Sequence, residues 1–541
     1  MKQLLRILVL LAVVLSCDKM PDAPSPYEDV VGDGVTMYGY VTSGGGGVEG
    51  VVVSDGYEVT TTRYDGRYEL KSDKQNGYVF ISVPSGYESE SKGVLPQFFA
   101  RCSSPADIVE RCDFSLKKVN QDEYHVLVMG DMHLAGRTFC RDFEQFRRFS
   151  AEVTTVPYAA DGPVYALTLG DMTWDVYWQT SPFDLTDYVL EIQKDFRGMQ
   201  FFHTMGNHDN DPSLVGDFPG ESTYRKVIGP NYYSFNIGEV HYIVLDDILY
   251  KNAPAGTRDF SPQVTDAQME WIRKDLHYVK KDTPVVVAMH SPLYRRDGSS
   301  ALYNLGTFIK CFEGYRYVQF LTAHMHSVYN VDMLSRSIHI FENNSGAVCG
   351  AWWMTDTACG SGMNLCSDGA PGGYRILEVS GSDIKWRYKG TSCNEDSLFR
   401  TYDRNQIWMS KEKYVPHASV ADQAAFVTSV GEYSRPSSSN QVLLNIWDYD
   451  PSWKISVKEN GKTLKVTRLS DVKDPLYLAV YEAYEYEHRY SVSYPASLTD
   501  HMFCVYASGP STTLDIEITD RFGRRYRETM TRPKPFIIEN Y

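Results

Sequence analysis

The sequence has few features that would tie the folded chain to a membrane or to nucleic acid. Beyond residue 15, no stretch approaches the roughly 18 apolar residues that a membrane-spanning helix needs. Basic residues are in the minority, because 53 Lys and Arg stand against 69 Asp and Glu and give a net charge of −16. That balance argues against a basic surface for nucleic acid. The spacing of the ten cysteines is not that of a zinc knuckle. We therefore expect no transmembrane helix after the N-terminus and no specific nucleic-acid binding.

The length of the chain predicts several domains. At about 100–200 residues per domain, 541 residues correspond to two to four domains. The chain contains 39 Tyr and 40 Gly, a composition that favours β-rich modules with many turns. No internal repeat is evident.

The N-terminus is typical of an export signal. Lys2 and Arg6 supply positive charge, and the apolar run beside them is too short for a comfortable membrane span. A small residue precedes Cys17, and this pattern resembles a bacterial lipobox, whose cysteine becomes the lipidated first residue. We expect residues 1–17 to be a lipoprotein signal peptide and 18–34 to be a polar tether. The mature protein would then be anchored through lipid to the membrane of the bacterial cell envelope, on its periplasmic face or at the cell surface. The alternative is an ordinary signal peptide with a chance cysteine.

The region 35–120 reads as an all-β domain. Asp55-Gly56 and Asp65-Gly66 separate β-branched and aromatic runs, and Asp-Gly pairs in that setting indicate hairpins. The pattern resembles the carboxypeptidase-regulatory-like β-sandwich. That resemblance implies a spacer and assigns no chemistry to this domain.

The central region, 122–392, alternates short apolar runs with helical stretches. Apolar runs of this length are typical of buried strands in layered α/β folds. One helix is expected near 182–196, and another should begin at Thr265 with Gln268 in a capping box. After residue 392 the sequence is again β-like, so 393–541 is expected to be a C-terminal all-β domain. The expected strands of the central region are 124–129, 164–169, 200–205, 240–245, 284–289 and 317–322.

Polar clusters follow five of these apolar runs. In open α/β sheets, ligands gather at the carboxyl ends of the strands, so the five clusters should converge. Asp-x-His and His-x-His each place two side chains on one face of an extended segment. Carboxylate oxygens and imidazole nitrogens suit Mn, Fe or Zn ions. The clusters are Gly130-Asp131-Met132-His133, Gly170-Asp171, Gly206-Asn207-His208-Asp209, His290-Ser291-Pro292 and Ala323-His324-Met325-His326.

This set of motifs resembles the calcineurin-like metallophosphoesterase family over residues 122–392. The resemblance implies a four-layer α/β core, two mixed β-sheets flanked by helices, with two metal ions at the strand ends. It also implies that Asp171 bridges both ions and that His208 is a catalytic group oriented by Asp209. One departure is Ala323, which stands where the family usually has glycine. By the resemblance, Asp131, His133 and His326 hold the first metal, and Asn207, His290 and His324 hold the second.

The resemblance implies hydrolysis of phosphate esters. A metal-activated hydroxide would attack phosphorus and His208 would protonate the leaving oxygen. Monoesters and diesters both fit this chemistry, so the substrate stays open among small-molecule and glycan- or lipid-linked phosphate esters. One alternative is a noncatalytic surface-binding lipoprotein with a structural or degenerate metal site, and another is a glycan-binding lipoprotein that works through its β domains.

Two further segments supply candidate substrate contacts. Trp352 and Trp353 lie in a Gly-rich stretch that resembles the start of a C-terminal module attached to some bacterial calcineurin-like enzymes, which places a family boundary near 345. These tryptophans could line a pocket or simply cover a sheet. Tyr294 and Arg295 follow His290 and could meet a substrate anion, or they could form a solvated loop.

Overall fold

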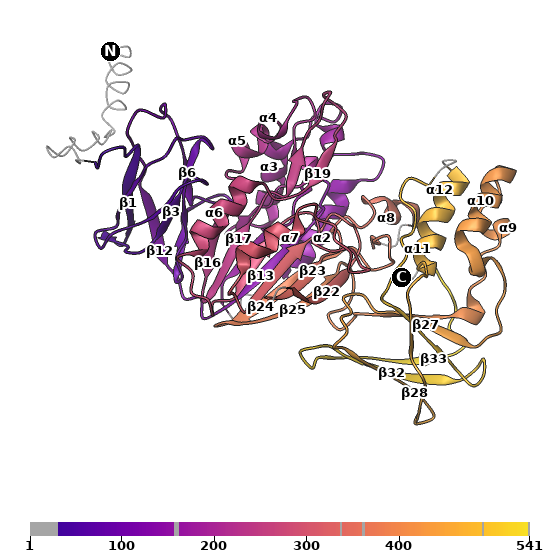
Figure 1. The fold of residues 1–541 in the computed structure, drawn as a ribbon. Coiled ribbons are helices and arrows are strands. Elements are labelled where there is room, and N and C mark those ends of the chain that lie inside the picture. Colours follow the sequence, from indigo (N-terminus) through magenta and orange to yellow (C-terminus); the bar gives the residue numbers. More distant parts are fainter. Residues whose placement is uncertain (1–30, 156–161, 336–337, 360–362, 489–491, 539–541) are drawn as a thin grey trace, which may run out of the picture.

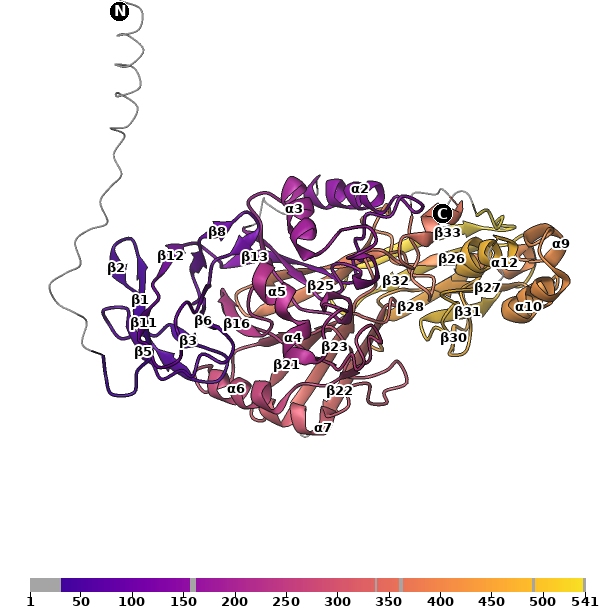
Figure 2. The ribbon, with the colours of Figure 1, turned by 90° about the horizontal axis from the view of Figure 1, so that it is seen from above.

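The computed structural model describes residues 31–155, 162–335, 338–359, 363–488 and 492–538. The expected signal peptide and most of the expected tether lie outside these residues. Three regions follow one another along the molecule, with the N-terminal module at one end and the C-terminal module at the other (Figures 1 and 2). Within the described chain, no helix combines the length and the apolar character needed to span a membrane.

The N-terminal module consists of two facing β-sheets. β1 pairs with β5 and β12, while β6 pairs with β3 and β10 in the second sheet. Gly56 and Gly66 of the two Asp-Gly pairs have φ values of 89° and 80°, the left-handed conformation that such turns require. The strands are β1 Met37–Ser43, β2 Gly46–Gly47, β3 Val52–Ser54, β4 Val59–Thr61, β5 Arg67–Leu70, β6 Tyr78–Ser82, β7 Tyr87–Ser89, β10 Phe99–Arg101, β11 Glu110–Arg111 and β12 Phe114–Lys118.

Two sheets form the core of the central region. The first has the order β15-β14-β13-β24-β25, in which β13, β14 and β15 are parallel and β24 is antiparallel. Its strands are β13 Glu123–Met129, β14 Val164–Thr168, β15 Gln200–Phe202, β24 Gly373–Ser380 and β25 Asp383–Gly390. The second has the order β16-β17-β20-β21-β23-β22. Its strands are β16 Tyr233–Ile237, β17 Val240–Val244, β20 Val285–Ala288, β21 Tyr317–Thr322, β22 Tyr329–Ser335 and β23 Ile338–Asn344.

Helices cover the outer face of each sheet. Side chains alternate along β13: Val126 and Val128 face the second sheet, whereas Leu127 and Met129 face helices. The helices α2 Asp142–Thr155 and α3 Leu185–Asp195 pack on the first sheet, and α6 Asp266–Leu276 and α7 Leu305–Phe308 pack on the second. The predicted four-layer fold of two mixed sheets flanked by helices is therefore confirmed.

The two helices expected from the sequence are present. Thr265 caps α6, because its hydroxyl accepts a hydrogen bond from Gln268 N at 3.3 Å. The side chain of Gln268 does not complete a capping box but donates to Asp246 O at 2.7 Å. α3 begins later than expected because Asp184 is its N-cap, which accepts from Thr186 N at 2.7 Å.

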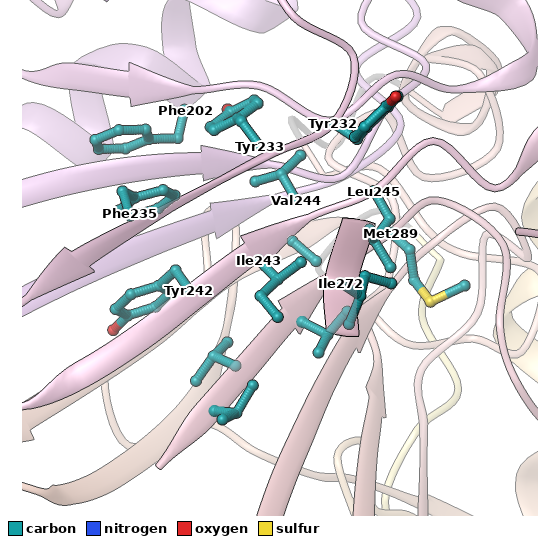
Figure 3. Close-up of a cluster of buried hydrophobic side chains, with 14 of the residues drawn as sticks. Phe202, Tyr232, Tyr233, Phe235, Tyr242, Ile243, Val244, Leu245, Ile272 and Met289 are labelled. Atoms are coloured by element: carbon teal, nitrogen blue, oxygen red, sulfur yellow. The ribbon is translucent and has the colours of Figure 1, made fainter. Parts of the chain in front are cut away.

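An aromatic stack joins the two sheets. Phe202 of β15 lies flat on Phe235 of β16, with ring centroids 3.8 Å apart and planes 8° apart. Phe235 in turn stacks on Tyr242 of β17 at 5.0 Å (Figure 3). Phe202 is the last residue of β15, and the third polar cluster follows this strand. The stack therefore holds that end of the first sheet against the second sheet.

The N-terminal module packs on the second sheet and α6. Trp271 Nε1 donates to Ser54 Oγ at 3.1 Å, and the Tyr232 hydroxyl donates to Gly56 O at 3.0 Å. An isolated β-bridge joins Val83 to Phe235. These contacts bury one continuous apolar cluster that runs from the module into the central domain.

The C-terminal region is not purely β. It has two four-stranded sheets, β26-β27-β31-β30 and β29-β28-β32-β33, and helices beside them (Figure 1). The helix α10 Val420–Val430 is capped by Ser419. A serine in this position is a helix start signal, and the prediction of β structure alone did not take it into account. The other elements are α9 Lys411–Tyr414, α11 Pro475–Tyr477, α12 Ala483–His488, β26 Arg400–Asp403, β27 Gln441–Asn445, β28 Lys454–Glu459, β29 Lys462–Thr463, β30 Thr467–Leu469, β31 Met502–Tyr506, β32 Thr513–Thr519 and β33 Arg525–Thr531.

Candidate metal centre

The predicted ligands come together where the carboxyl ends of the two central sheets meet. They follow β13, β14 and β15 of the first sheet and β20 and β21 of the second. Two groups of side chains have ligand atoms within 4.8 Å of one another. One group contains Asp131, His133 and His326, and the other contains Asp171, His290 and His324.

The first group is fully buried. His133 Nε2 lies 3.1 Å from His326 Nε2, and His326 Nε2 lies 3.5 Å from Asp131 Oδ1. Asp131 Oδ1 is buried and has no hydrogen-bond partner among the described residues. A buried acceptor without a partner costs about 1–3 kcal/mol, and more when it is charged. A cation held between these three side chains would offset that cost, so the residues present fit a metal ion.

The second group adds the amide of Asn207. His290 Nε2 lies 3.0 Å from His324 Nδ1 and 3.0 Å from Asn207 Oδ1. His324 is partly exposed, whereas the histidines of the first group are buried. The second group is therefore the more open half of the centre.

Asp171 has the position that a bridging carboxylate needs. Its Oδ2 lies 3.5 Å from His133 Nε2 of the first group and 3.3 Å from His290 Nε2 of the second. The other oxygen, Oδ1, accepts a hydrogen bond from His208 N at 2.8 Å. One carboxylate oxygen thus faces both groups while the second fixes the side chain.

Backbone carbonyls orient two of the histidines. Nδ1 of His290 pairs with Leu169 O at 2.7 Å, and Nδ1 of His326 pairs with Gly350 O at 2.6 Å. A carbonyl can only accept, so Nδ1 carries the proton in both rings and Nε2 points to the centre, as in many metal sites.

Burial sets the charge of most of these rings. It lowers the pKa of His326 to about 4 and, together with the neighbouring His290, that of His324 to about 3. Both rings are therefore neutral at pH 7, the form that binds a metal. Burial also opposes protonation of His290, but the carboxylate of Asp171 outweighs it and raises the pKa of His290 to about 10. A cation binding there would displace that proton.

The ligand loops are held in unusual backbone conformations. Their φ values lie in the left-handed region, which costs about 1–3 kcal/mol per non-glycine residue. Such conformations aim consecutive side chains at one point. They occur at Asp131, His133, Asp171, His324 and His326, with φ between 44° and 68°.

Close packing also explains two glycines and one alanine. A Cβ on Gly206 would lie 2.3 Å from Asp171 N, so only glycine lets these two loops meet. A Cβ on Gly130 would lie 2.6 Å from Ala323 Cβ. The absence of a side chain at Gly130 makes room for the Ala323 methyl group, so the departure from the family pattern leaves the neighbouring ligands in place.

His208 lies beside the two groups and is oriented by Asp175. Its Nδ1 is 2.7 Å from Asp175 Oδ1, and 24% of its side chain is exposed. Arg258 Nε donates to the other oxygen of Asp175. Burial disfavours the charged ring, but Asp171 and the hydrogen-bonded Asp175 outweigh burial and raise the pKa of His208 above its ordinary value.

The expectation that Asp209 orients His208 is wrong. Asp209 is fully buried, and its carboxylate accepts hydrogen bonds from Gly206 N at 3.0 Å and Met172 N at 3.0 Å. Asp209 therefore links the loop of the second polar cluster, which Met172 follows, to the loop of the third, which contains Gly206. The sequence did contain Asp175, four residues after Asp171, but no motif connected it to His208.

The two tryptophans predicted as substrate contacts differ in their exposure. Trp352 is half-buried and stacks on the ligand His326, with ring centroids 3.9 Å apart, and on Tyr494 at 3.7 Å. Trp353 is buried, and its indole donates to Met132 O at 2.8 Å, so it cannot meet a substrate.

Tyr294 and Arg295, the other two predicted substrate contacts, also differ in their exposure. Tyr294 is buried in the core of the second sheet, so it too cannot meet a substrate. Arg295 is exposed and lines a cavity between the central domain and the C-terminal region. Tyr494 was missed by sequence analysis because nothing local to it signals a contact with Trp352.

Comparisons with known proteins place this centre in a family. The model of the calcineurin-like phosphoesterase domain matches residues 124–328. Models for the N-terminal and C-terminal parts of calcineurin-like phosphoesterases match residues 35–119 and 342–526. The last match includes β24 and β25, so the C-terminal family segment completes the first central sheet.

Similar solved structures include two distant ones. The sulfate thiohydrolase SoxB from Thermus thermophilus, in complex with glycerol, has 11% identity and a TM-score of 0.26, and the match covers 50% of this chain and 56% of that one. Zinc-complexed Vps29 from Entamoeba histolytica has 11% identity and a TM-score of 0.21, and the match covers 49% of this chain and 98% of that one. No curated protein matches the sequence. On the three family models and the ligand set that the structure assembles, the chain belongs to the calcineurin-like phosphoesterase family.

Proposed function

We propose that the chain hydrolyses phosphate esters at a dinuclear metal centre. The observation that carries this proposal is the position of one shared carboxylate. Asp171 Oδ2 lies 3.5 Å from His133 Nε2 and 3.3 Å from His290 Nε2. Asp131, His133 and His326 would hold one ion, and Asn207, His290 and His324 the other. Two transition-metal ions such as Mn, Fe or Zn would supply Lewis-acid activation of a water nucleophile and neutralise charge on the phosphate.

His208 supplies the proton in this proposal. The Asp175 carboxylate holds its Nδ1, so Nε2 is the atom left to face a bound ester. The raised pKa of His208 favours the protonated ring, the form that a general acid requires. Transfer of that proton to the leaving oxygen lets the alcohol depart uncharged.

A panel of esters tests the activity. Purified protein would be stripped of metal, reloaded with Mn²⁺, Fe²⁺ or Zn²⁺, and assayed with a monoester, 4-nitrophenyl phosphate, and a diester, bis(4-nitrophenyl) phosphate. We expect metal-dependent hydrolysis of at least one of them. No hydrolysis of either ester, or of a panel of phosphorylated sugars and lipid headgroups, with any of the three metals would contradict the proposal.

We also propose that the mature chain is anchored to the cell envelope through a lipid on Cys17, where it would meet small-molecule or glycan- or lipid-linked phosphate esters. The support is the apolar run that ends at Cys17 and the polar segment after it. Mass spectrometry of the protein from its native host should find an acylated N-terminal cysteine. An unmodified N-terminus would overturn this proposal and leave the catalytic one untouched.

A further inference from the structure

Two adjacent aspartates, Asp246 and Asp247, follow β17, the strand beside β20 in the second sheet. Carboxylates are rarely buried in soluble proteins unless they are paired or hydrogen-bonded, because they lose their hydration. Asp247 has no exposed surface, so its carboxylate depends on hydrogen-bond donors inside the protein.

Both oxygens of Asp247 accept hydrogen bonds from the loop that carries a candidate metal ligand. Oδ1 accepts from His290 N and Oδ2 accepts from Ser291 N, each at 2.8 Å. The amide before them, Met289 N, still donates to Leu321 O of β21 at 3.1 Å. Asp247 therefore binds the first two amides that leave the sheet at the end of β20.

The backbone around Asp247 is held independently of the ligand loop. The carbonyl oxygen of Asp247 accepts from Gln263 N at 2.8 Å, directly after β19 (Phe260–Pro262). Asp246 N donates to Oε1 of Gln268 in α6 at 3.1 Å. The β19 segment and α6 therefore fix the place of the carboxylate, and the carboxylate in turn fixes the start of the ligand loop.

His290 is held at its ring and at both of its backbone polar groups. Its Nδ1 pairs with Leu169 O at 2.7 Å, and its carbonyl oxygen accepts from Ala323 N at 2.9 Å. These contacts leave Nε2 at 3.3 Å from Asp171 Oδ2. The bond from His290 N to Asp247 involves a charged acceptor, and such bonds are roughly twice as strong as those between neutral groups.

We propose that Asp247 is a positioning residue that holds His290 in place for the second metal ion. The inference rests on the proposed dinuclear centre and assigns a residue that is not itself a ligand to the affinity of one ion. Among the described residues, the side chain of Asp247 bonds only to His290 and Ser291. Its loss should therefore weaken the second ion and spare the first, whose ligands are Asp131, His133 and His326.

Asp247→Asn tests this role with little change in size. Asparagine has one acceptor oxygen and one NH₂ group, so it accepts from one of the two amides and turns a donor towards the other. Loss of a residue that orients a metal ligand costs about 10–100-fold in metal affinity. The dissociation constant of the second Mn²⁺ ion should rise by that factor, with the first unchanged. Calorimetric titration of the stripped protein with Mn²⁺ measures both constants.

Asp474→Asn is the matched control. Asp474 is equally buried, and its Oδ1 accepts from Leu476 N at 2.9 Å and from Tyr477 N at 3.0 Å. It stands at the start of α11 in the C-terminal region and not at a ligand loop. This variant should lower Tm and leave both Mn²⁺ affinities unchanged. A loss confined to Asp247→Asn therefore separates positioning from a general loss of stability.

Hydrogen exchange of the stripped wild-type protein tests the inference without any variant. The amides of His290 and Ser291 should be as protected as those of β20 before metal is added, because Asp247 already holds them. Amides that exchange freely until Mn²⁺ binds would overturn the inference, since the metal and not Asp247 would then order the loop.

The remaining outcomes separate this inference from the proposed function. Equal affinity for the second Mn²⁺ ion in the wild type and in Asp247→Asn would overturn the inference and leave the phosphoesterase function standing. A wild type that binds two ions but hydrolyses no ester would refute the function and leave the role of Asp247 standing. A wild type that binds no second Mn²⁺ ion would refute both.

Discussion

The N-terminal and C-terminal modules both pack on the central domain, but in the described parts of the chain they differ in how near they come to the candidate metal ligands. The N-terminal module meets α6 and β16 through Ser54, Gly56 and Val83, and none of its hydrogen bonds among the described residues involves a candidate ligand. The C-terminal region stacks Tyr494 on Trp352, which lies on the ligand His326. The first module therefore packs on α6 and the second central sheet, whereas the C-terminal region contributes an aromatic ring to the surroundings of a candidate metal ligand.

The largest effect should come from replacing Asp171, because its carboxylate is shared by the two ligand groups of the central domain. Asp171→Asn removes the charge that faces both groups, so we expect loss of metal from both and a fall in kcat/KM of about 10³-fold or more. Elemental analysis and steady-state kinetics measure these effects. Asp122→Asn, at an exposed position in the same domain, is the control. Full metal loading of the Asp171 variant would show that the ligand assignment is wrong.

Removal of His208 should give the next largest effect and should separate catalysis from metal binding. His208→Ala should lower kcat by about 10²–10⁴-fold, the usual range for general acid–base help, with both ions still bound. The loss should be greater for phenyl phosphate than for 4-nitrophenyl phosphate, whose leaving group departs without a proton. A variant that loses a metal ion would instead identify His208 as a ligand.

Substitutions of Asp175 and Asp209 should have different effects on the pH dependence of kcat. Asp175 raises the pKa of His208, so the acid form persists to higher pH in the wild type. In Asp175→Asn that pKa falls, and the alkaline limb of the kcat profile should move to lower pH with a rate loss of about 10–100-fold.

Asp209→Asn provides the comparison, because Asp209 bonds to backbone amides and not to His208. This variant should lower thermal stability without moving the alkaline limb. A shift of equal size in both variants would contradict the assignment of Asp175 as the positioning residue.

The smallest effects test the two modules directly. Tyr494→Ala removes a stacking contact worth about 0.5–1.5 kcal/mol, so kcat/KM should fall about 2-fold to 10-fold through the position of Trp352. Phe99→Ala removes a half-buried ring of the N-terminal module, which packs edge-on against Tyr78, and should lower Tm without changing kcat/KM. Equal kinetic losses in the two variants would break the contrast between the modules.

The parts of the site that could be predicted were those written in contiguous motifs. Asp131 and His133 share one loop directly after a strand, and the order of such loops along the chain is enough to predict their convergence. The partner of His208 could not be predicted, because Asp175 meets it only through the packing of two separate loops.

Non-local pairing limited the fold prediction in the same way. The six expected strands are present, but β24 returns late in the chain to pair with β13 at the centre of the first sheet. That pairing depends on where the intervening chain leads, and no local pattern encodes it. The helical layer beside the C-terminal sheets was missed for a different reason, since the Ser419 cap was visible in the sequence.

The most direct test of the central claim is a metal titration of the stripped protein with hydrolysis as the readout. We expect activity towards a phosphate ester to rise with added Mn²⁺ and to stop rising at two ions per chain, with proton release as the His290 ring binds metal. Activity that is complete at one ion per chain, or that does not depend on added metal at all, would contradict a dinuclear centre bridged by Asp171.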